Sequence, residues 1–246
     1  MAYKVTSLYK AYGKERVLGG LDLEFPAGKV TVVLGPSGCG KTSLLNILAG
    51  LDKAYSGSVT GFESDAISYV FQEDRLLPWM GAKANIAFAL RNKMGKELAE
   101  KAATDALLAV GLAPYLEARP GSLSGGMRRR VALARAFAYP SDLFLLDEPF
   151  SSLDLKTRIA VMDLFLKLRA SDGRGAVIVT HDVREAIYLA DRIVSLSEKP
   201  SVVVDSLDID MSRADRSFAS GAAAALEARL YASILSPAHS KEWPGH

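Results

Sequence analysis

Residues 35–42 read Gly35-Pro36-Ser37-Gly38-Cys39-Gly40-Lys41-Thr42. This stretch fits the pattern G-x-x-x-x-G-K-[ST], and its surroundings agree with it. The apolar, β-branched run at residues 30–34 predicts a buried strand directly before the stretch. The segment from Lys41 to about Ala49 predicts a helix with a leucine-rich buried side, and Gly50 is placed to end that helix. A strand, a glycine-rich loop and a helix in this order predict the core of an α/β fold.

The residue types of this stretch suit the binding of phosphate groups. Glycines let the backbone wrap closely around an anion with its amide N–H groups turned inward, and the following helix presents its positive end to the same anion. Lys41 can reach the β- and γ-phosphates of a nucleoside triphosphate, and the Thr42 hydroxyl can ligate magnesium. We therefore expect ATP with Mg²⁺ at this loop, held by Gly35, Pro36, Ser37, Gly38, Cys39, Gly40, Lys41, Thr42 and Ser43.

Cys39 is the only cysteine of the chain, and it lies inside the loop. The simpler interpretation is a small side chain that fits there. The alternative is a thiol made reactive by neighbouring amide groups and by Lys41. A single cysteine forms no internal disulfide, which favours a reducing compartment.

Length and composition are those of an ordinary globular protein. The 246 residues are 49% hydrophobic and 24% charged, which suits one large α/β domain. The net charge is +2, from 30 basic and 28 acidic side chains, so we expect no general attraction to nucleic acid. No apolar run reaches the roughly 18 residues that span a bilayer, and Met1–Val5 lacks the apolar core of a signal peptide. These features favour the cytoplasm.

Further apolar runs organise the rest of the chain. Residues 3–29 predict antiparallel strands and turns, whereas Ala66–Phe71, Leu143–Leu146 and Ala176–Thr180 predict buried strands. Strands that alternate with helices imply a parallel sheet covered on both faces. Helices are expected within residues 82–115, and over 126–138, 155–170 and 222–235, with a further helix capped by Asp182 and with Glu185 as its capping-box partner.

Two carboxylates follow the strand that ends at Leu146. A strand placed beside the phosphate loop would bring Asp147 to the magnesium shell. Glu148, one residue on, could then polarise the attacking water as the general base. An acidic turn after a strand is the alternative, and the phosphate loop earlier in the chain makes it the weaker one.

Two further segments carry groups that suit a phosphate. Ser124, Gly125 and Gly126 open a helix, where a hydroxyl, amides and the helix dipole could grip an anion. A second such segment makes sense if it grips the nucleotide of a partner subunit. His181 ends the third predicted strand, where it could contact a γ-phosphate, although a lone histidine is more often structural.

Together these motifs resemble the nucleotide-binding subunits of ABC transporters, in the order and at the spacings of that family, from Tyr3 to about Asp205. The resemblance implies that residues 35–42 are Walker A and that Leu143–Asp147 is Walker B, with Glu148 as the catalytic glutamate. It further assigns the signature to Leu123–Met127, the D-loop to 151–154 with Asp154, the switch histidine to His181, the magnesium- and permease-sensing Q-loop glutamine to Gln72, and the adenine-stacking aromatic to Tyr12.

The resemblance also implies an architecture and partners. We expect a P-loop NTPase core with a parallel sheet, an N-terminal antiparallel β-subdomain and a helical subdomain inserted at about 82–138, all within residues 1–205. Residues 206–246 form a tail with one predicted helix, for which packing is the first interpretation and regulation the alternative. The subunit is expected to form a head-to-tail dimer that hydrolyses ATP on the cytoplasmic face of the inner membrane. It would serve permease subunits and, indirectly, a solute-binding protein.

Three stretches leave alternatives open. Met127 stands where the family usually has glutamine, which puts its part in the dimer contact in doubt. Arg128–Arg130 predicts a solvated face, or else contact with acidic groups or nucleotide. Leu76–Trp79 resembles importer subunits for nitrate, sulfonates and taurine. Its exposed apolar residues suit a groove for a permease helix, with core packing as the alternative for Trp79.

Other assignments within the family remain open as well. Importers of thiamine precursors look alike at Leu76–Trp79. An exporter subunit, or an ABC ATPase that acts in translation or DNA repair, is a more distant alternative, because those proteins usually carry membrane spans, tandem ATPase domains or a long coiled coil.

Overall fold

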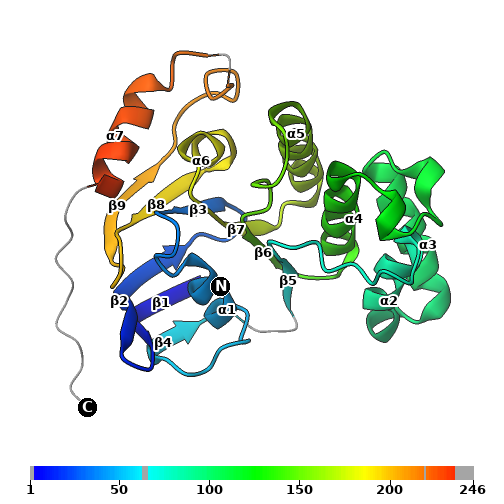
Figure 1. Cartoon of the computed structure of the whole chain (residues 1–246), viewed down its shortest axis with the longest axis horizontal. Helices are drawn as coiled ribbons and strands as arrows, with labels where there is room; N and C mark the ends of the chain where they lie inside the picture. The colour runs from blue at the N-terminus through cyan, green and yellow to red at the C-terminus, as the bar shows by residue number, and fades with distance from the viewer. Residues whose placement is uncertain (1–2, 63–65, 219, 236–246) are drawn as a thin grey trace.

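The computed structural model describes residues 3–62, 66–218 and 220–235. The molecule is elongated, with two β-sheets toward one end and a group of helices at the other (Figure 1). The arrangement is the α/β fold expected from the sequence, with an antiparallel N-terminal sheet beside the main sheet.

The main sheet has the strand order β5-β6-β7-β3-β8-β9. The strands from β5 to β8 run parallel, and β3, β6 and β7 are buried along their whole length. Their bounds are Val30–Leu34 for β3, Ile67–Val70 for β5, Leu143–Asp147 for β6, Gly175–Thr180 for β7, Arg192–Leu196 for β8 and Val203–Asp208 for β9.

The predicted parallel sheet carries one antiparallel edge strand, because β9 runs antiparallel to β8. The reason is the short connection at residues 197–202, since a parallel crossover needs a dozen or more residues. β9 also crosses the predicted end of the ATPase domain at residue 205.

The N-terminal sheet has the order β2-β1-β4 and is antiparallel, as residues 3–29 predict. It is built from β1 (Tyr3–Tyr12), β2 (Glu15–Phe25) and β4 (Ser56–Thr60). One hydrophobic cluster joins this sheet to one side of the main sheet through α1 (Lys41–Leu48). The phosphate loop therefore lies between two packed sheets.

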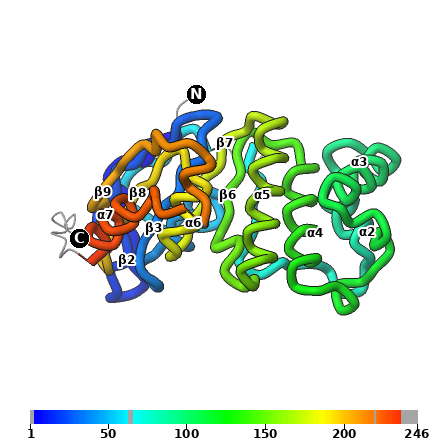
Figure 2. The backbone as a smooth tube through the Cα atoms, turned by 90° about the horizontal axis from the view of Figure 1, so that it is seen from above, coloured from blue at the N-terminus to red at the C-terminus, as the bar shows by residue number. Residues whose placement is uncertain are grey.

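Three helices at the far end bury a hydrophobic cluster of their own. They are α2 (Ala82–Met94), α3 (Lys96–Ala109) and α4 (Gly125–Ala138), with the short turns η2 (Ala113–Tyr115) and η3 (Pro120–Ser122) between α3 and α4. In two perpendicular views α4 stands between the outer pair, α2 and α3, and the rest of the molecule, with α5 (Leu155–Asp172) beside it (Figures 1 and 2).

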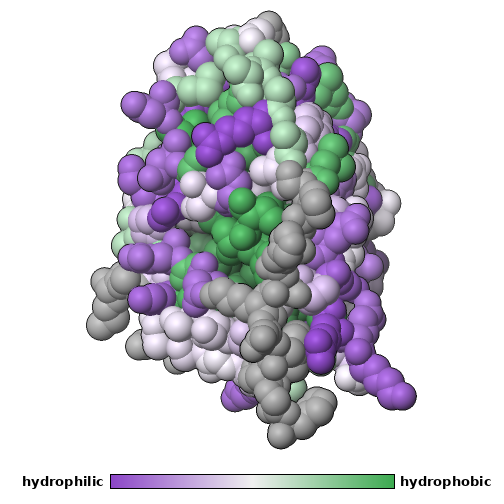
Figure 3. Space-filling view, turned by 90° about the vertical axis from the view of Figure 1, so that its left-hand side faces the viewer, coloured by the Kyte–Doolittle hydropathy of each residue, from purple (hydrophilic) through white to green (hydrophobic). Residues whose placement is uncertain are grey.

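The C-terminal helix α7 (Ala224–Leu235) packs against α6 (Val183–Leu189) and the strands β8 and β9. Leu230 is buried in the same cluster as the sheet, and Arg229 donates to Asp205 at 3.0 Å. On the face that carries α7, hydrophilic side chains surround an apolar area (Figure 3). These contacts favour packing as the role of the predicted tail helix.

None of the helices in residues 3–62, 66–218 and 220–235 combines the length and apolar character that crossing a bilayer requires.

Two predictions about helix ends had different outcomes. Gly50 ends α1 as expected: its φ is 70°, and its N–H donates to the Ile47 carbonyl. Asp182 caps α6, because its Oδ1 accepts from the N–H of Glu185. The prediction that Glu185 completes a capping box is wrong. Its side chain accepts from Thr180 Oγ1 at 2.8 Å instead.

Candidate functional site

The phosphate loop takes a conformation that needs glycine at its last turn. Gly40 has a φ of 107°, and a Cβ there would lie 2.6 Å from Val17 Cγ1. The following residue, Lys41, begins α1, so the amino end of that helix faces the loop. The loop thus joins β3 to α1 with the helix dipole directed at the space that it encloses.

Lys41 supplies a buried cation to this space. Its side chain is 4% exposed, and Nζ donates to the carbonyls of Gly35 at 2.9 Å and Pro36 at 2.8 Å. The same Nζ lies 3.9 Å from Oε1 of Glu148. The loop's own carbonyls therefore hold the ammonium group in place.

A cavity of about 390 Å³ opens over the loop. Half of the predicted site residues line it, and they come from the N-terminal sheet, from α1 and from the loops after β3, β5 and β6. Those lining residues are Tyr12, Ser37, Gly38, Gly40, Lys41, Thr42, Ser43, Gln72 and Glu148. A second cavity, of about 440 Å³ and lined by Tyr3, Asp142 and Gly175 among others, contains no predicted site residue.

Two further residues line this cavity without belonging to any motif of the sequence: Val17 and Lys199. Lys199 lies in the turn between β8 and β9, and its Nζ donates to Glu15 Oε1 at 2.7 Å. Glu15 stands directly opposite Tyr12 in the ladder of β1 and β2. A lysine before a proline in a turn carries no pattern that predicts a ligand, so no signal in the sequence could have found Lys199.

Asp147 lies at the carboxyl end of β6 and reaches the helix after the loop. Thr42 Oγ1 donates to Asp147 Oδ1 at 3.1 Å. The Asp147 carboxyl is 3% exposed, and burial raises its pKa above the ordinary value. An acidic oxygen and a hydroxyl therefore meet at the edge of the cavity.

Glu148 follows with an unusual backbone. Its φ is 39°, a backbone conformation that residues other than glycine rarely adopt. Such residues cluster at functional sites. Its N–H donates to the Val179 carbonyl at 3.0 Å, and its own carbonyl accepts from Ser151 Oγ at 3.1 Å. The carboxylate then lies 3.1 Å from Nδ1 of His181. The backbone is thus fixed on both sides of a carboxylate that faces the cavity.

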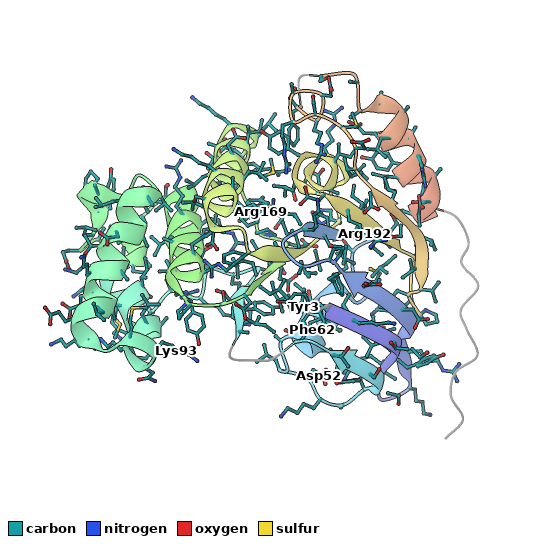
Figure 4. The ribbon with its side chains drawn as sticks, turned by 180° about the vertical axis from the view of Figure 1, so that it is seen from behind. Tyr3, Asp52, Phe62, Lys93, Arg169 and Arg192 are labelled. Atoms are coloured by element: carbon teal, nitrogen blue, oxygen red, sulfur yellow. The ribbon has the colours of Figure 1, made fainter. Side chains whose placement is uncertain are left out.

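Tyr12 and Gln72 both line the cavity. The Tyr12 hydroxyl donates to Asp52 Oδ2 at 3.1 Å and lies 3.3 Å from Ser43 Oγ. Asp52, labelled in Figure 4 beside the N-terminal sheet, also pairs with Lys10 at 2.7 Å. Half of the tyrosine surface remains open to solvent, although the hydroxyl is anchored.

Ser124, Gly125, Gly126 and Asp154 do not line this cavity. Ser124 caps α4, with its Oγ accepting from Met127 N–H at 3.2 Å, and it is exposed. Asp154 caps α5 in the same way through Thr157 N–H at 3.1 Å. The structure of one chain therefore leaves the Ser124–Gly126 segment free of the nucleotide cavity of that same chain.

Burial decides between the open alternatives at three places. Cys39 is 2% exposed and burial raises the pKa of its thiol, which favours the small side chain over the reactive thiol. The solvated face predicted for Arg128–Arg130 is wrong for Arg129, which is 2% exposed. Trp79, in contrast, is 66% exposed, so core packing is the wrong alternative for it in this chain.

Comparison with known proteins agrees with this geometry. The sequence profile described as ABC transporter matches residues 18–151. The chain is 41% identical over 213 residues to an aliphatic sulfonates import ATP-binding protein, SsuB 1, of Xanthomonas axonopodis, covering 83% of this chain and 84% of that protein. It is 42% identical over 240 residues to the protein of the same name from Rhizobium johnstonii, covering 95% and 86%.

Solved structures give the same answer for the fold. The chain superposes on a dimeric bacterial ABC transporter cassette, MJ0796, with a TM-score of 0.75 and 31% identity, covering 86% of this chain and all of the other. A post-hydrolysis form of that cassette bound to ADP and Pi gives a TM-score of 0.73. The resemblance to importer subunits seen in the sequence is confirmed by the names of these relatives. The chain belongs to the ABC transporter family, and it is an ATP-binding and ATP-hydrolysing subunit of that family.

Proposed function

We propose that this chain energises the import of an aliphatic sulfonate, or of a chemically similar small solute, through a separate membrane permease. The relatives at 41–42% identity carry that activity in their names, which supports import over export or a role in translation or DNA repair. The observation that carries the chemistry is the carboxylate of Glu148, held 3.1 Å from His181 and 3.9 Å from Lys41 in one cavity.

The predicted residues then have distinct parts in ATP hydrolysis. Lys41 and the amides of residues 35–43 bind the phosphates, and Tyr12 stacks on the adenine. Glu148 accepts a proton from the attacking water, and His181 orients that carboxylate and contacts the γ-phosphate. Gln72, at the rim of the cavity, senses the phosphate end of the nucleotide.

The residues present fit a magnesium ion. Thr42 and Asp147 offer hard oxygen ligands 3.1 Å apart, the donor type that Mg²⁺ prefers. Mg²⁺ usually keeps several waters and binds one or two carboxylates together with phosphate oxygens, so a single carboxylate beside a hydroxyl suits it. We propose that Thr42 and Asp147 hold it, with Gln72 nearby. The ion would neutralise the charge of the β- and γ-phosphates.

We further propose a head-to-tail dimer of two copies. Ser124, Gly125 and Gly126 lie outside the cavity of their own chain and are at least partly exposed, so they can close over the nucleotide of a second copy. Asp154, at the start of α5, would contribute to the same interface. A nearly complete switch from open to closed requires about 5.5 kcal/mol of differential binding, which a triphosphate gripped from both sides can supply.

The permease contact is proposed at the segment before α2. Trp79 is exposed there on a loop that Asn85 holds with four hydrogen bonds, to the Leu77 N–H and to the carbonyls of Leu77, Met80 and Gly81. A rigid loop that presents an indole suits a partner helix better than solvent does. The subunit would thereby sit on the cytoplasmic face of the inner membrane, and a solute-binding protein would deliver the solute from the other side.

Our proposal for the domain organisation keeps the predicted domains with one change. We propose an ATPase domain with a helical subdomain at 82–138 inserted in it. Because β9 belongs to the main sheet, the domain is best ended after Asp208 rather than at residue 205.

Reconstitution with the permease and the solute-binding protein encoded by neighbouring genes tests the proposal. ATP hydrolysis should rise when the binding protein is loaded with an alkanesulfonate, and Glu148→Gln should abolish turnover while leaving ATP binding intact and trapping the dimer. If a thiamine precursor or nitrate stimulates ATP hydrolysis and the sulfonate does not, the proposed substrate class is wrong. Normal turnover by Glu148→Gln would remove the proposed chemistry altogether.

A further inference from the structure

Arg129 lies in the second turn of α4, and its guanidinium is buried against two other segments of the chain, residues 71–74 and 148–149. Nη1 donates to the carbonyl of Phe71 at 2.8 Å and lies 3.3 Å from Oδ1 of Asp74. Nη2 donates to the carbonyl of Glu148 at 3.3 Å, and Nε donates to the carbonyl of Pro149. One side chain therefore binds both carbonyls of Glu148–Pro149, here called the catalytic turn, and the carbonyl of the residue before Gln72.

Burying a guanidinium costs free energy, because the charge loses its hydration. The guanidinium is 2% exposed, and burial lowers the pKa of Arg129 from its ordinary value, whereas Asp74 opposes that shift. Among the residues that the structure describes, Asp74 is the one carboxylate in contact with the buried charge, and the remaining acceptors are backbone carbonyls. The planar guanidinium has N–H donors fixed in several directions and can bind several carbonyls at once. A lysine ammonium is a compact charge without this fixed geometry.

The position of these carbonyls connects the contact to hydrolysis. Glu148 has a φ of 39°, and the Arg129 bond ends on the carbonyl of that strained residue. Phe71 immediately precedes Gln72, which lines the nucleotide cavity. α4 itself begins at the Ser124 cap, the segment proposed to close over a second nucleotide. A movement of α4 would thus reach both cavity residues through one guanidinium.

We propose that Arg129 is a positioning residue that keeps Glu148 and Gln72 in a fixed relation and ties both to the helix opened by Ser124. The inference rests on the functions proposed above for Glu148 and Gln72. Arg129 does not touch the nucleotide. It sets where the Glu148 carboxylate points, so its loss lowers the rate of the chemical step and not the affinity for ATP.

The test compares Arg129→Gln with a matched variant, Arg135→Gln, in the full-length chain. Arg135 lies on the same helix and donates to the carbonyls of Asp74 and Arg75, both at 2.9 Å, but it has no bond to the catalytic turn. The readouts are kcat for ATP hydrolysis, Kd for ATP by nucleotide fluorescence, and Tm. Arg129→Gln should lower kcat by about 10- to 100-fold, the cost of a small misplacement of a catalytic group, with the Kd for ATP within about twofold.

Arg135→Gln should change Tm with a kcat near that of the unmodified chain. Parallel losses of kcat, ATP affinity and Tm in both variants would show a purely structural role and overturn the inference. If Arg129→Gln does not fold, Arg129→Lys keeps the charge without the fork, and it should show the same separation of kcat from Kd. A Lys variant with full kcat would also overturn it.

Glu148→Gln is measured in the same series. An inactive Glu148→Gln beside a fully active Arg129→Gln contradicts this inference alone, whereas an active Glu148→Gln contradicts the proposed function.

Discussion

The Nδ1 atom of His181 lies 3.1 Å from Oε1 of Glu148. The two residues follow the carboxyl ends of β7 and β6, which are neighbouring parallel strands with Asp147 opposite Val179. The ladder between these strands fixes the spacing of the two side chains. The glutamate is 16% exposed and the histidine 47%, so the pair has one face toward the cavity and one toward solvent.

Replacing His181 by alanine should remove the group that orients the Glu148 carboxylate. We expect kcat for ATP hydrolysis to fall by about 100-fold, which is typical for the loss of a group that supports general base catalysis. The Kd for ATP should stay within about twofold, because Lys41 and the loop amides remain. Steady-state hydrolysis and nucleotide titration measure the two quantities, and an unchanged kcat would contradict the role.

A Cβ at Gly126 would lie 2.5 Å from Cγ2 of Thr157, so Gly126→Ala should force α4 away from α5. We expect the free energy of unfolding to fall by about 1–3 kcal/mol, which is the usual cost of an overpacked contact. Thr157→Ser removes the offending methyl and keeps the hydroxyl and the N–H that Asp154 caps. The double variant should therefore recover most of the stability in urea denaturation; a double variant as unstable as Gly126→Ala would show that another contact is responsible.

Lys199→Ala should weaken nucleotide binding without destabilising the fold. Its ion pair with Glu15 is exposed, 36% and 63% for the two side chains, and exposed pairs contribute little to stability. The ammonium nevertheless lines the cavity that takes a highly charged triphosphate. We expect the Kd for ATP to rise by up to about tenfold, or about 1.4 kcal/mol, with unchanged Tm.

Lys83→Ala is the matched control, because Lys83 forms a similar surface pair with Glu117 away from the cavity. Equal effects of the two variants on the Kd would rule out a local role for Lys199.

The ion pair of Lys10 and Asp52 should give stability that depends on pH. The hydrogen bond from Lys10 holds the pKa of Asp52 below its ordinary value of 3.8. A lowered folded pKa contributes stability that is fully present above the unfolded pKa and is lost as pH falls through the folded pKa. Asp52→Asn should therefore cost about 1.5 kcal/mol near neutral pH, with the gap to the unmodified chain closing below about pH 4.

The same variant should weaken ATP binding, because Asp52 also accepts from the Tyr12 hydroxyl. Urea unfolding across pH, with nucleotide titration at neutral pH, checks both effects. A gap that stays constant down to low pH would contradict the assignment to Asp52.

Variants of Asn85 and Trp79 should have different effects, the first on the stability of the loop and the second on binding of the permease. Asn85→Ala leaves the part-buried Leu77 N–H and the carbonyls that Asn85 binds without this partner, so we expect a loss of about 1–3 kcal/mol of unfolding free energy. Trp79→Ala should leave stability unchanged, because the indole is 66% exposed, and should abolish co-purification with the permease. Retained co-purification by Trp79→Ala would move the permease contact elsewhere.

The sequence predicted the parts of the fold that local patterns control. The buried strand at 30–34 and the helix after Lys41 occur as expected, and Gly50 ends that helix with a positive φ. The strands β8 and β9 were not predicted. In β9 the residues alternate between half-buried and exposed, so the apolar pattern is weak there, and the hairpin that makes it an edge strand depends on its partner β8.

Tertiary contacts overrode local rules at other positions. Glu185 has the spacing of a capping-box glutamate, yet it turns inward because the Thr180 hydroxyl offers a buried bond. Arg129 belongs to a basic run at a helix start, which is typical of a solvated face. It is buried because the carbonyls of Phe71 and Glu148, 58 and 19 residues away in sequence, converge on it. No sequence pattern encodes such a convergence.

Cys39 has a practical consequence for following the motions of this ATPase. It is the only cysteine in the chain, it is 2% exposed, and burial raises the pKa of its thiol, so little reactive thiolate is present. The unmodified chain is therefore a quiet background for thiol-specific dyes and spin labels. A cysteine placed at exposed Ser124 would report its surroundings without removing the native residue from the phosphate loop.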